Sequence, residues 1–252
     1  MEILANMKSR RVVYTSSQVA VIDDFLDSAT FQRVLRYCGD AHFQTVHANQ
    51  WRMVWRITDG YPLQGGTVYW APTEVVLPDV APKARHPIGA DIDLFVDQLL
   101  SVLPDVQDII GAPARDWNDF TVAPWIYPPG SALSLHQDGF RYSGAFTFFA
   151  HRRWNIHWGG YLLVLDPATP RARDWYETQT DTARISWIDD TDENSRVCEP
   201  GFAHCIFPKP NRLVFLSPEA QHLLSRVDQN AGQHPRISVA GFFRRPQRTG
   251  TR

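Results

Sequence analysis

The feature that most constrains this chain is a series of short apolar segments that begins at Phe120 and continues almost to its end. The first segment shows the alternation of apolar and polar residues that is typical of a strand, the later segments are short apolar runs, and Gly, Pro and Asn separate them. We predict eight strands here, at about 120–127, 133–136, 145–150, 160–165, 204–207, 212–216, 222–227 and 236–243. This pattern favours a mainly β fold, a sandwich or jelly roll with helices packed outside it.

The chain before Phe120 has a different character. Residues 18–23 read as a short strand, and residues 51–57 alternate and are rich in aromatic side chains, which predicts a second strand. Residues 61–72 contain two adjacent glycines and predict a loop or hairpin. Helical spacing of the apolar residues predicts helices at 27–37 and 90–103, the second of which a proline should end. We expect these elements to flank the β region.

The length of 252 residues is enough to bury a full core, and β sandwiches of this size are often undivided. We therefore expect one domain over residues 1–252, with its jelly-roll core at about 118–245 and flanking helices and strands at about 18–117.

Composition excludes several classes of protein. The net charge of −2 gives no reason to expect nucleic acid or an anionic membrane as a partner. Cys38, Cys198 and Cys205 are odd in number and have no paired spacing, which argues against a disulfide framework or a zinc ribbon. The first residues lack the apolar core of a signal peptide, and no stretch has the length of a membrane span. We expect a soluble, cytoplasmic protein.

A His-x-Asp pair follows the turn Pro128-Pro129-Gly130. In an extended segment His136 and Asp138 point the same way, so an imidazole and a carboxylate offer two neighbouring ligands for a divalent metal. With a second histidine they would form a two-histidine-one-carboxylate facial triad, which leaves positions on Fe(II) open for a co-substrate and dioxygen. Taken alone, such a pair is more often part of a surface turn.

Further motifs follow in a fixed order. They are YPPG at 127–130 with LSLHQD at 133–138, FFAH at 148–151 with Trp154 and WGG at 158–160, NRLVF at 211–215, and His222 with RISVAGFF at 236–243. In this order they resemble the prolyl 4-hydroxylase-like 2-oxoglutarate/Fe(II) oxygenases over about residues 19–244. Each motif alone is a weak signal, but four motifs in this order are a strong one.

The resemblance implies a double-stranded β-helix with Fe(II), 2-oxoglutarate and O2 as cofactors and co-substrates, and ascorbate as a reductant. It implies that His136, Asp138 and His222 bind the iron. The basic-x-Ser motif implies that Arg236 pairs with the distal carboxylate of 2-oxoglutarate through its planar fork, with Ser238 on the same face as a second donor. Tyr127 is a further candidate for co-substrate binding, although a tyrosine in the core of a strand fits nearly as well.

Other residues compete for roles at this site. His204, at the start of a predicted strand, is the alternative third ligand. His151 and Trp158 are candidates for substrate contact near the mouth of a pocket, with core burial as the alternative for the tryptophan. Arg141 could steer an acidic substrate. The family often has a tyrosine hydroxyl where this chain has phenylalanine, so Thr147 or Ser238 would have to supply that donor.

The function implied is hydroxylation of an unactivated C–H, coupled to decarboxylation of 2-oxoglutarate to succinate. The carboxylate of Asp138 argues against a halogenase, which needs that position vacated. No peptide-binding repeat is evident, so we favour a small-molecule substrate, an amino-acid-derived metabolite, over a peptidyl or protein hydroxylase.

Two other classes remain open. A cupin-type sensor or binding protein without redox chemistry explains the His-x-Asp pair but gives no reason for Arg236 and Ser238; a zinc hydrolase is a weaker candidate. The long polar stretch at 167–201 lies between two predicted strands; such a stretch is most often a solvated loop, and a lid over the substrate is the alternative hypothesis.

Overall fold

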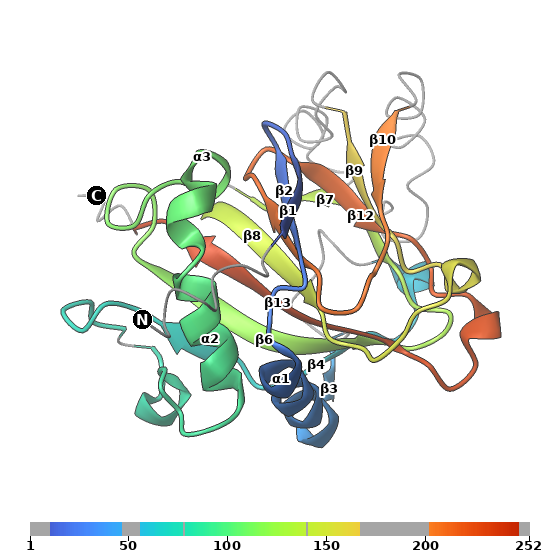
Figure 1. Cartoon of the computed structure of the whole chain (residues 1–252), viewed down its shortest axis with the longest axis horizontal. Helices are drawn as coiled ribbons and strands as arrows, with labels where there is room; N and C mark the ends of the chain where they lie inside the picture. The colour runs from blue at the N-terminus through green and yellow to red at the C-terminus, as the bar shows by residue number, and fades with distance from the viewer. Residues whose placement is uncertain (1–10, 47–55, 78, 140, 167–201, 247–252) are drawn as a thin grey trace.

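The computed structural model describes residues 11–46, 56–77, 79–139, 141–166 and 202–246. These residues form two sheets of short antiparallel strands. In Figure 1, the three α-helices gather on one side of the molecule, and β9 and β10 lie on the other. Two facing antiparallel sheets confirm the predicted jelly-roll class, a double-stranded β-helix. None of the helices in these ranges is long and apolar enough to cross a lipid bilayer.

The larger sheet has nine strands in the order β1-β2-β11-β8-β13-β6-β4-β3, and β5 also pairs with β6. Their bounds are β1 (Arg11–Thr15), β2 (Val19–Asp23), β3 (Gln44–Thr45), β4 (Leu63–Gln64), β5 (Val68–Trp70), β6 (Asp119–Tyr127), β8 (Tyr142–Phe149), β11 (Leu213–Leu216) and β13 (Arg236–Arg244).

The smaller sheet has four strands in the order β10-β9-β12-β7, so β7 forms one of its edges. Their bounds are β7 (Leu133–Gln137), β9 (Leu162–Leu165), β10 (Ala203–Ile206) and β12 (Gln221–Leu224). All eight strands predicted after residue 118 are therefore present, with ends that differ by a few residues. The sequence predicted them well because short apolar runs are bounded by strong turn residues in this region.

Three α-helices lie outside the larger sheet: α1 (Ser28–Asp40), α2 (Ile92–Leu100) and α3 (Gln107–Ile110). Asp27 caps α1, because its carboxylate accepts hydrogen bonds from the backbone N–H groups of Ala29 and Thr30. Short 3-10 turns complete the chain: η2 (Ile57–Asp59), η3 (Pro82–Ala84), η4 (Leu103–Val106), η5 (Ile156–Trp158) and η7 (Gln229–Ala231). The helix predicted to reach residue 103 ends at Leu100, ahead of the proline-containing turn η4.

The N-terminal half departs from the sequence prediction in two places. Most of the strand predicted at 51–57 lies outside the described residues, and its last residue, Ile57, begins the turn η2 instead. The loop or hairpin predicted at 61–72 contains the two short strands β4 and β5, both of which pair with β6 rather than with each other. Strand pairing to a long neighbour is a tertiary property that these few residues do not encode.

The outer face of the larger sheet packs against the helices. Phe95 of α2 lies 5.1 Å from Phe148 of β8, and Phe25 lies 5.8 Å from the same ring, all three within one fully buried cluster. Val239 and Phe243 of β13 belong to that cluster. This aromatic layer is the main hydrophobic core of the protein.

The inner face of the larger sheet looks toward the smaller sheet. Two smaller apolar clusters fill the ends of this space: one contains Phe149 and Val164, the other Tyr127 and Leu224. Each cluster joins strands of both sheets. The polar residues of the candidate site come from the same inner faces.

Candidate metal and co-substrate site

The two histidines of the site come from neighbouring strands of the smaller sheet. His136 of β7 lies directly opposite His222 of β12, and their ring centroids are 4.2 Å apart. The residues next to them, Leu135 and Leu223, pack together on the outer face of the sheet. Because side chains alternate along a strand, both imidazoles face the larger sheet. Both are buried, with 8% and 6% of their surface exposed.

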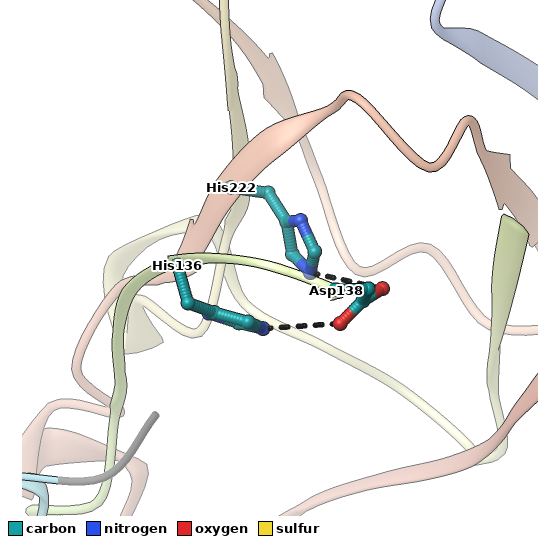
Figure 2. A group of neighbouring side chains, drawn as sticks. All are labelled: His136, Asp138 and His222. Carbon is teal, nitrogen blue, oxygen red and sulfur yellow. Dashed lines mark ion pairs between the residues drawn. The ribbon is translucent and has the colours of Figure 1, made fainter. Parts of the chain in front are cut away.

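Asp138 follows β7 by one residue and completes the group. His136 Nε2 lies 3.5 Å from Asp138 Oδ1, and His222 Nε2 lies 4.0 Å from Asp138 Oδ2. Figure 2 shows both rings on the same side of Asp138, with their near nitrogens directed at its two carboxylate oxygens. These distances are longer than an ordinary hydrogen bond, so the three groups converge on a common point without bonding tightly to one another.

The hydrogen bonds of the far ring nitrogens fix the tautomer of both histidines. His136 Nδ1 lies 2.8 Å from the carbonyl oxygen of Ser134, and His222 Nδ1 lies 3.0 Å from that of Ala220. A carbonyl oxygen only accepts, so each Nδ1 carries the proton. Each Nε2 therefore presents a lone pair toward Asp138, the arrangement that metal-binding histidines use.

The protonation states of the group suit a cation. Burial, and after it the neighbouring His136, lower the pKa of His222 to about 4, so the ring is neutral at neutral pH. Burial raises the pKa of the Asp138 carboxyl, but His222 and His136 lower it by more, so it lies below its usual value. Two neutral imidazoles and one carboxylate are the ligand set of a two-histidine-one-carboxylate metal site.

The ligand atoms of His136, Asp138 and His222 all lie within 4.8 Å of one another. Within the part of the chain that the structure describes, no other group of three His, Cys, Asp or Glu side chains meets this condition. The structure thus brings together the three residues that the motifs singled out. Their role as metal ligands stays a prediction.

Arg236 extends from β13 on the inner face of the larger sheet. It is 3% exposed, and its guanidinium lies over the rings of Phe149, at 4.8 Å, and Tyr127, at 5.3 Å. Its Nη1 donates to Ser238 Oγ at 3.2 Å. Burial lowers the pKa of Arg236 to about 10, so it remains charged at neutral pH. Among the described residues no carboxylate pairs with this buried cation.

The adjacent glycines of the WGG motif hold this arginine in place. Arg236 Nε donates to the carbonyl oxygen of Gly160 at 3.0 Å. Gly160 has a φ of +67°, and a Cβ there would lie 3.1 Å from both Arg236 Cδ and Trp154 Cζ2. A glycine is therefore needed for both the backbone angle and the close approach. It acts as a backbone support and contributes no side chain to the site.

Tyr127 and Ser238 lie beside Arg236, as the motif implied. Tyr127 is the cross-strand neighbour of Arg236, and Ser238 lies two residues further along β13 on the same face. Burial raises the pKa of the Tyr127 phenol above its usual range, so it keeps its proton. Whether either residue contacts a co-substrate stays a prediction.

His151 lies elsewhere than expected. It is 5% exposed; its Nε2 lies 2.7 Å from the carbonyl oxygen of Pro208, and its Nδ1 lies 3.2 Å from that of Ile237. Both ring nitrogens thus face the backbone, and neither is directed at a substrate. Burial lowers the pKa of His151 to about 4, so the ring is neutral at neutral pH. Substrate contact by His151 stays a prediction, and these backbone contacts do not support it.

The structure places Trp158 and Arg141, the other two candidates for substrate contact, in different surroundings. The ring of Trp158 stacks on His234 at 4.7 Å and meets Trp154 edge-on at 5.4 Å, so its contacts are with the fold itself. Arg141 is exposed, three residues after Asp138. His204 is exposed on β10, where it contacts Tyr14, and it lies outside the three-residue group. The lid predicted at 167–201 falls outside the described residues.

Two residues near the site were not predicted from the sequence. The carboxylate of Asp59 hydrogen-bonds Ser134 on β7, although 75 residues separate them. Tyr142 stacks on Phe242 at 4.6 Å, and besides burial the charge of Asp138 raises the pKa of its phenol. No local pattern marks Asp59, whereas Tyr142, four residues after Asp138, could have been weighed on proximity alone.

The fold and the converging side chains define a double-stranded β-helix protein with a two-histidine-one-carboxylate site. Solved structures of this fold agree over most of the chain. A prolyl-4-hydroxylase from Pseudomonas putida is 16% identical with a TM-score of 0.53, and the match covers 90% of this chain and 92% of that one. A prolyl hydroxylase from Trichoplax adhaerens, in complex with a hypoxia inducible factor peptide fragment, is 12% identical with a TM-score of 0.54, covering 91% and 84%.

A third similar structure is HygX from Streptomyces hygroscopicus, with nickel and 2-oxoglutarate bound, which is 14% identical with a TM-score of 0.50 and covers 90% of this chain and 82% of that one. No protein-family model matches the chain, and no curated protein sequence is similar enough to match. At these identities the comparisons establish the fold only. It is the fold that the motifs predicted, and the similar solved structures share it.

Proposed function

We propose that this protein is a 2-oxoglutarate/Fe(II)-dependent dioxygenase that hydroxylates an unactivated C–H of a small molecule. Iron, 2-oxoglutarate and O2 together supply the oxidation, and 2-oxoglutarate is converted to succinate and CO2. The residues of the chain hold these groups, orient them and keep water away. Each part of the proposal rests on a separate feature of the inner faces.

His136, Asp138 and His222 are the proposed iron ligands. Their Nε2 lone pairs and carboxylate converge, and both Nδ1 atoms are already committed to backbone carbonyls. The three buried polar groups do not bond tightly to one another. A divalent cation at this point would give each of them a partner. A facial set of three ligands leaves the opposite side of an octahedral ion open.

The observation that carries the assignment is Arg236. A buried charge is costly unless it is paired, and the described residues give this guanidinium only neutral acceptors and aromatic faces. A dicarboxylic acid whose one end binds the metal would bring its second carboxylate to this cation. Neither a cupin-type binding protein nor a zinc hydrolase needs such a residue across from the three ligands.

Ser238 and Tyr127 are proposed as neutral donors beside the same carboxylate. Ser238 Oγ already accepts from Arg236 Nη1, so its own proton is free to point elsewhere. The protonated phenol of Tyr127 is a donor in a nearly dry environment. Both would add hydrogen bonds to the fork that Arg236 presents.

The substrate is proposed to be an amino-acid-derived metabolite that carries an acidic group. Arg141 supports this, because an exposed cation so close to Asp138 along the chain would attract a carboxylate. The backbone of Arg141 is fixed, since its carbonyl oxygen accepts a hydrogen bond from the N–H of Arg245.

The test is a measurement of succinate formation by the purified protein supplied with Fe(II), 2-oxoglutarate, ascorbate and O2, beside Asp138→Ala as the control. We expect slow succinate formation without substrate, dependent on both Fe(II) and Asp138. Binding of iron without any consumption of 2-oxoglutarate would overturn the proposal in favour of a binding protein.

The substrate class is tested by adding free and N-acylated amino acids in one series and proline-containing peptides in another. Succinate formation above the uncoupled rate should occur in the first series and fall when Arg141 is replaced by Glu. Stimulation only by peptides would identify a peptidyl hydroxylase and contradict the small-molecule assignment.

A further inference from the structure

Strand β7 contains His136 and leads directly into Asp138, yet it is an edge strand. One side pairs with β12, and no described strand lies along the other. Backbone N–H groups on an open edge need other partners, and an edge strand without them is free to shift. The ring of His136 is oriented by the carbonyl oxygen of Ser134, on this same strand. The position of Ser134 therefore matters to the metal site.

The open edge is held by the carboxylate of Asp59, at the end of the turn η2. Its Oδ2 accepts from the N–H of Ser134 at 3.1 Å, and its Oδ1 accepts from Ser134 Oγ at 2.9 Å. Its backbone carbonyl accepts from the N–H of Ala132 at 2.9 Å. The N–H of Arg56 also donates to Oδ2, at 2.8 Å, which fixes the carboxylate on its own turn. Asp59 is only 2% exposed.

These contacts form one continuous chain from Asp59 through Ser134 to His136. Asp59 fixes the N–H and hydroxyl of Ser134, and the carbonyl oxygen of Ser134 fixes Nδ1 of His136 at 2.8 Å. His222 uses the carbonyl oxygen of Ala220, whose N–H donates to the backbone carbonyl oxygen of Ser217 rather than to a side chain. The two histidines are thus oriented by different means.

We propose that Asp59 is a positioning residue for the metal site: it pins the edge strand β7 at Ser134 and thereby sets the direction of the His136 imidazole. The inference rests on the proposed function only in that His136, Asp138 and His222 bind a divalent cation. Outer partners of metal-binding histidines typically alter metal affinity or activity by about 10- to 100-fold when removed. Asp59 acts one bond further out, so we expect the lower end of this range.

The experiment measures Co(II) binding to the metal-free protein without O2, by titration and by the visible absorption of the bound ion. Asp59→Ala should weaken Co(II) binding about 10-fold and change the absorption bands, because the His136 ring is released. Asp59→Asn keeps an oxygen for the two backbone N–H groups and should recover most of the affinity. Ser134→Ala removes only the hydroxyl bond and should weaken binding about threefold, below the full effect of removing the carboxylate.

Asp93→Ala is the matched control. Asp93 is a half-buried carboxylate in the first turn of α2, outside the larger sheet, and it accepts from the backbone N–H groups of Ile88, Gly89 and Ala90 in the segment before the helix. It should lower the melting temperature while leaving the Co(II) affinity and spectrum of the wild type. An Asp59→Ala protein that melts lower but binds Co(II) like the wild type would overturn the inference and leave Asp59 a purely structural residue.

Two further results would also decide between the positioning role and the metal site itself. If Asp59→Ala does not fold, Ser134→Ala decides, and an unchanged Co(II) affinity in that variant overturns the inference. If the wild type binds Co(II) no better than His136→Ala does, the metal site itself is wrong, and the failure belongs to the proposed function. Failure of the positioning role alone leaves wild-type binding intact, so the two results are distinguishable.

Discussion

The two faces of the larger sheet use the same strands for opposite purposes. On β13, Val239 and Phe243 face the helices and are fully buried in an aromatic layer, whereas Arg236 and Ser238 face the smaller sheet. On β8, Phe148 faces outward at 0% exposure, and its neighbour Thr147 faces inward and is half-buried. One face supplies most of the apolar burial, and the other contains the charged and polar groups.

Because side chains alternate along each strand, the residues that stabilise the fold and the residues that would bind ligands lie on opposite faces. Apolar burial is the dominant favourable term in folding, so the outer face stabilises the fold. The inner face contributes the buried cation of Arg236, and the smaller sheet that it faces contributes the carboxylate of Asp138; both groups cost free energy until a ligand compensates them. Substitutions on the two faces should therefore have opposite consequences for stability and for ligand binding.

Removing an inner-face metal ligand should have the largest effect on activity. Replacing His136, Asp138 or His222 by Ala should abolish measurable succinate formation, since a facial triad that lacks one ligand no longer holds iron in the required geometry. The thermal unfolding of the metal-free variants should stay within a few degrees of the wild type. If His222→Ala turns over at the wild-type rate, the assignment fails, and His204 becomes the candidate.

Removing an outer-face aromatic residue should have the reverse effect. Phe148→Ala should lower the free energy of unfolding by about 3–5 kcal/mol, because it leaves a cavity among Phe25, Phe31 and Phe95. Denaturant titration measures this, and the folded fraction should keep the 2-oxoglutarate dependence of the wild type. Thr147→Ala, one residue away on the opposite face, is the control for stability and should cost less than about 1 kcal/mol. Equal losses in the two variants would contradict the division between faces.

Substitutions of Arg236 should affect co-substrate binding and protein stability in opposite directions. Arg236→Ala should raise the 2-oxoglutarate requirement by at least about tenfold, since truncating one side of a buried charge pair costs about 2–5 kcal/mol. Arg236→Lys should recover part of this loss, because the charge remains but the fork does not. Titration of succinate formation measures both, and Co(II) binding without co-substrate should change little.

The stability of the metal-free protein should respond to Arg236 in the opposite sense. Arg236→Met replaces a buried charge with an apolar chain of similar length, so the free energy of unfolding should be equal or higher by about 1 kcal/mol or more. An unchanged co-substrate dependence in Arg236→Ala would transfer the role to Arg226, an exposed residue whose Nη1 donates to the carbonyl oxygen of Gly130.

Buried neutral histidines on the inner side should give the smallest effect, a pH dependence of stability. Burial lowers the pKa of both His222 and His151 from 6.5 to about 4. Their folded-state pKa lies below the unfolded value, so the unfolded state gains protons first and the metal-free protein loses stability as the pH falls between these values. Each should contribute a loss of about 2 kcal/mol between neutral pH and about pH 5.

Denaturant titrations across this range measure the slope. His151→Gln retains one N–H donor but does not titrate, so its slope should be shallower than that of the wild type, and His222→Gln should reduce the slope similarly. A wild-type slope in both variants would show that these rings do not become protonated on unfolding. The acid-sensitive carboxylates titrate at lower pH and do not share this window: hydrogen bonds to Arg212 and Lys209 hold the pKa of Asp23 below its usual value against burial, which raises it.

By itself, the sequence determined the strands after residue 118, the two faces of each strand and the shared direction of His136 and Asp138. It also determined that Arg236 and Ser238 point the same way. These properties follow from alternation along one strand, with Gly, Pro and Asn marking its ends, and they need no information about distant residues. The ordered motifs then identified the fold correctly.

Which of these side chains meet depends on the assembly of distant strands. His222 rather than His204 lies opposite His136 because the register of β12 on β7 places it there, 86 residues further along the chain. The same holds for His151, whose ring nitrogens lie against the carbonyls of Pro208 and Ile237, and for Asp59, which reaches the open edge of β7. Pairing register, edge position and burial arise when separate strands assemble, so no local pattern could specify them.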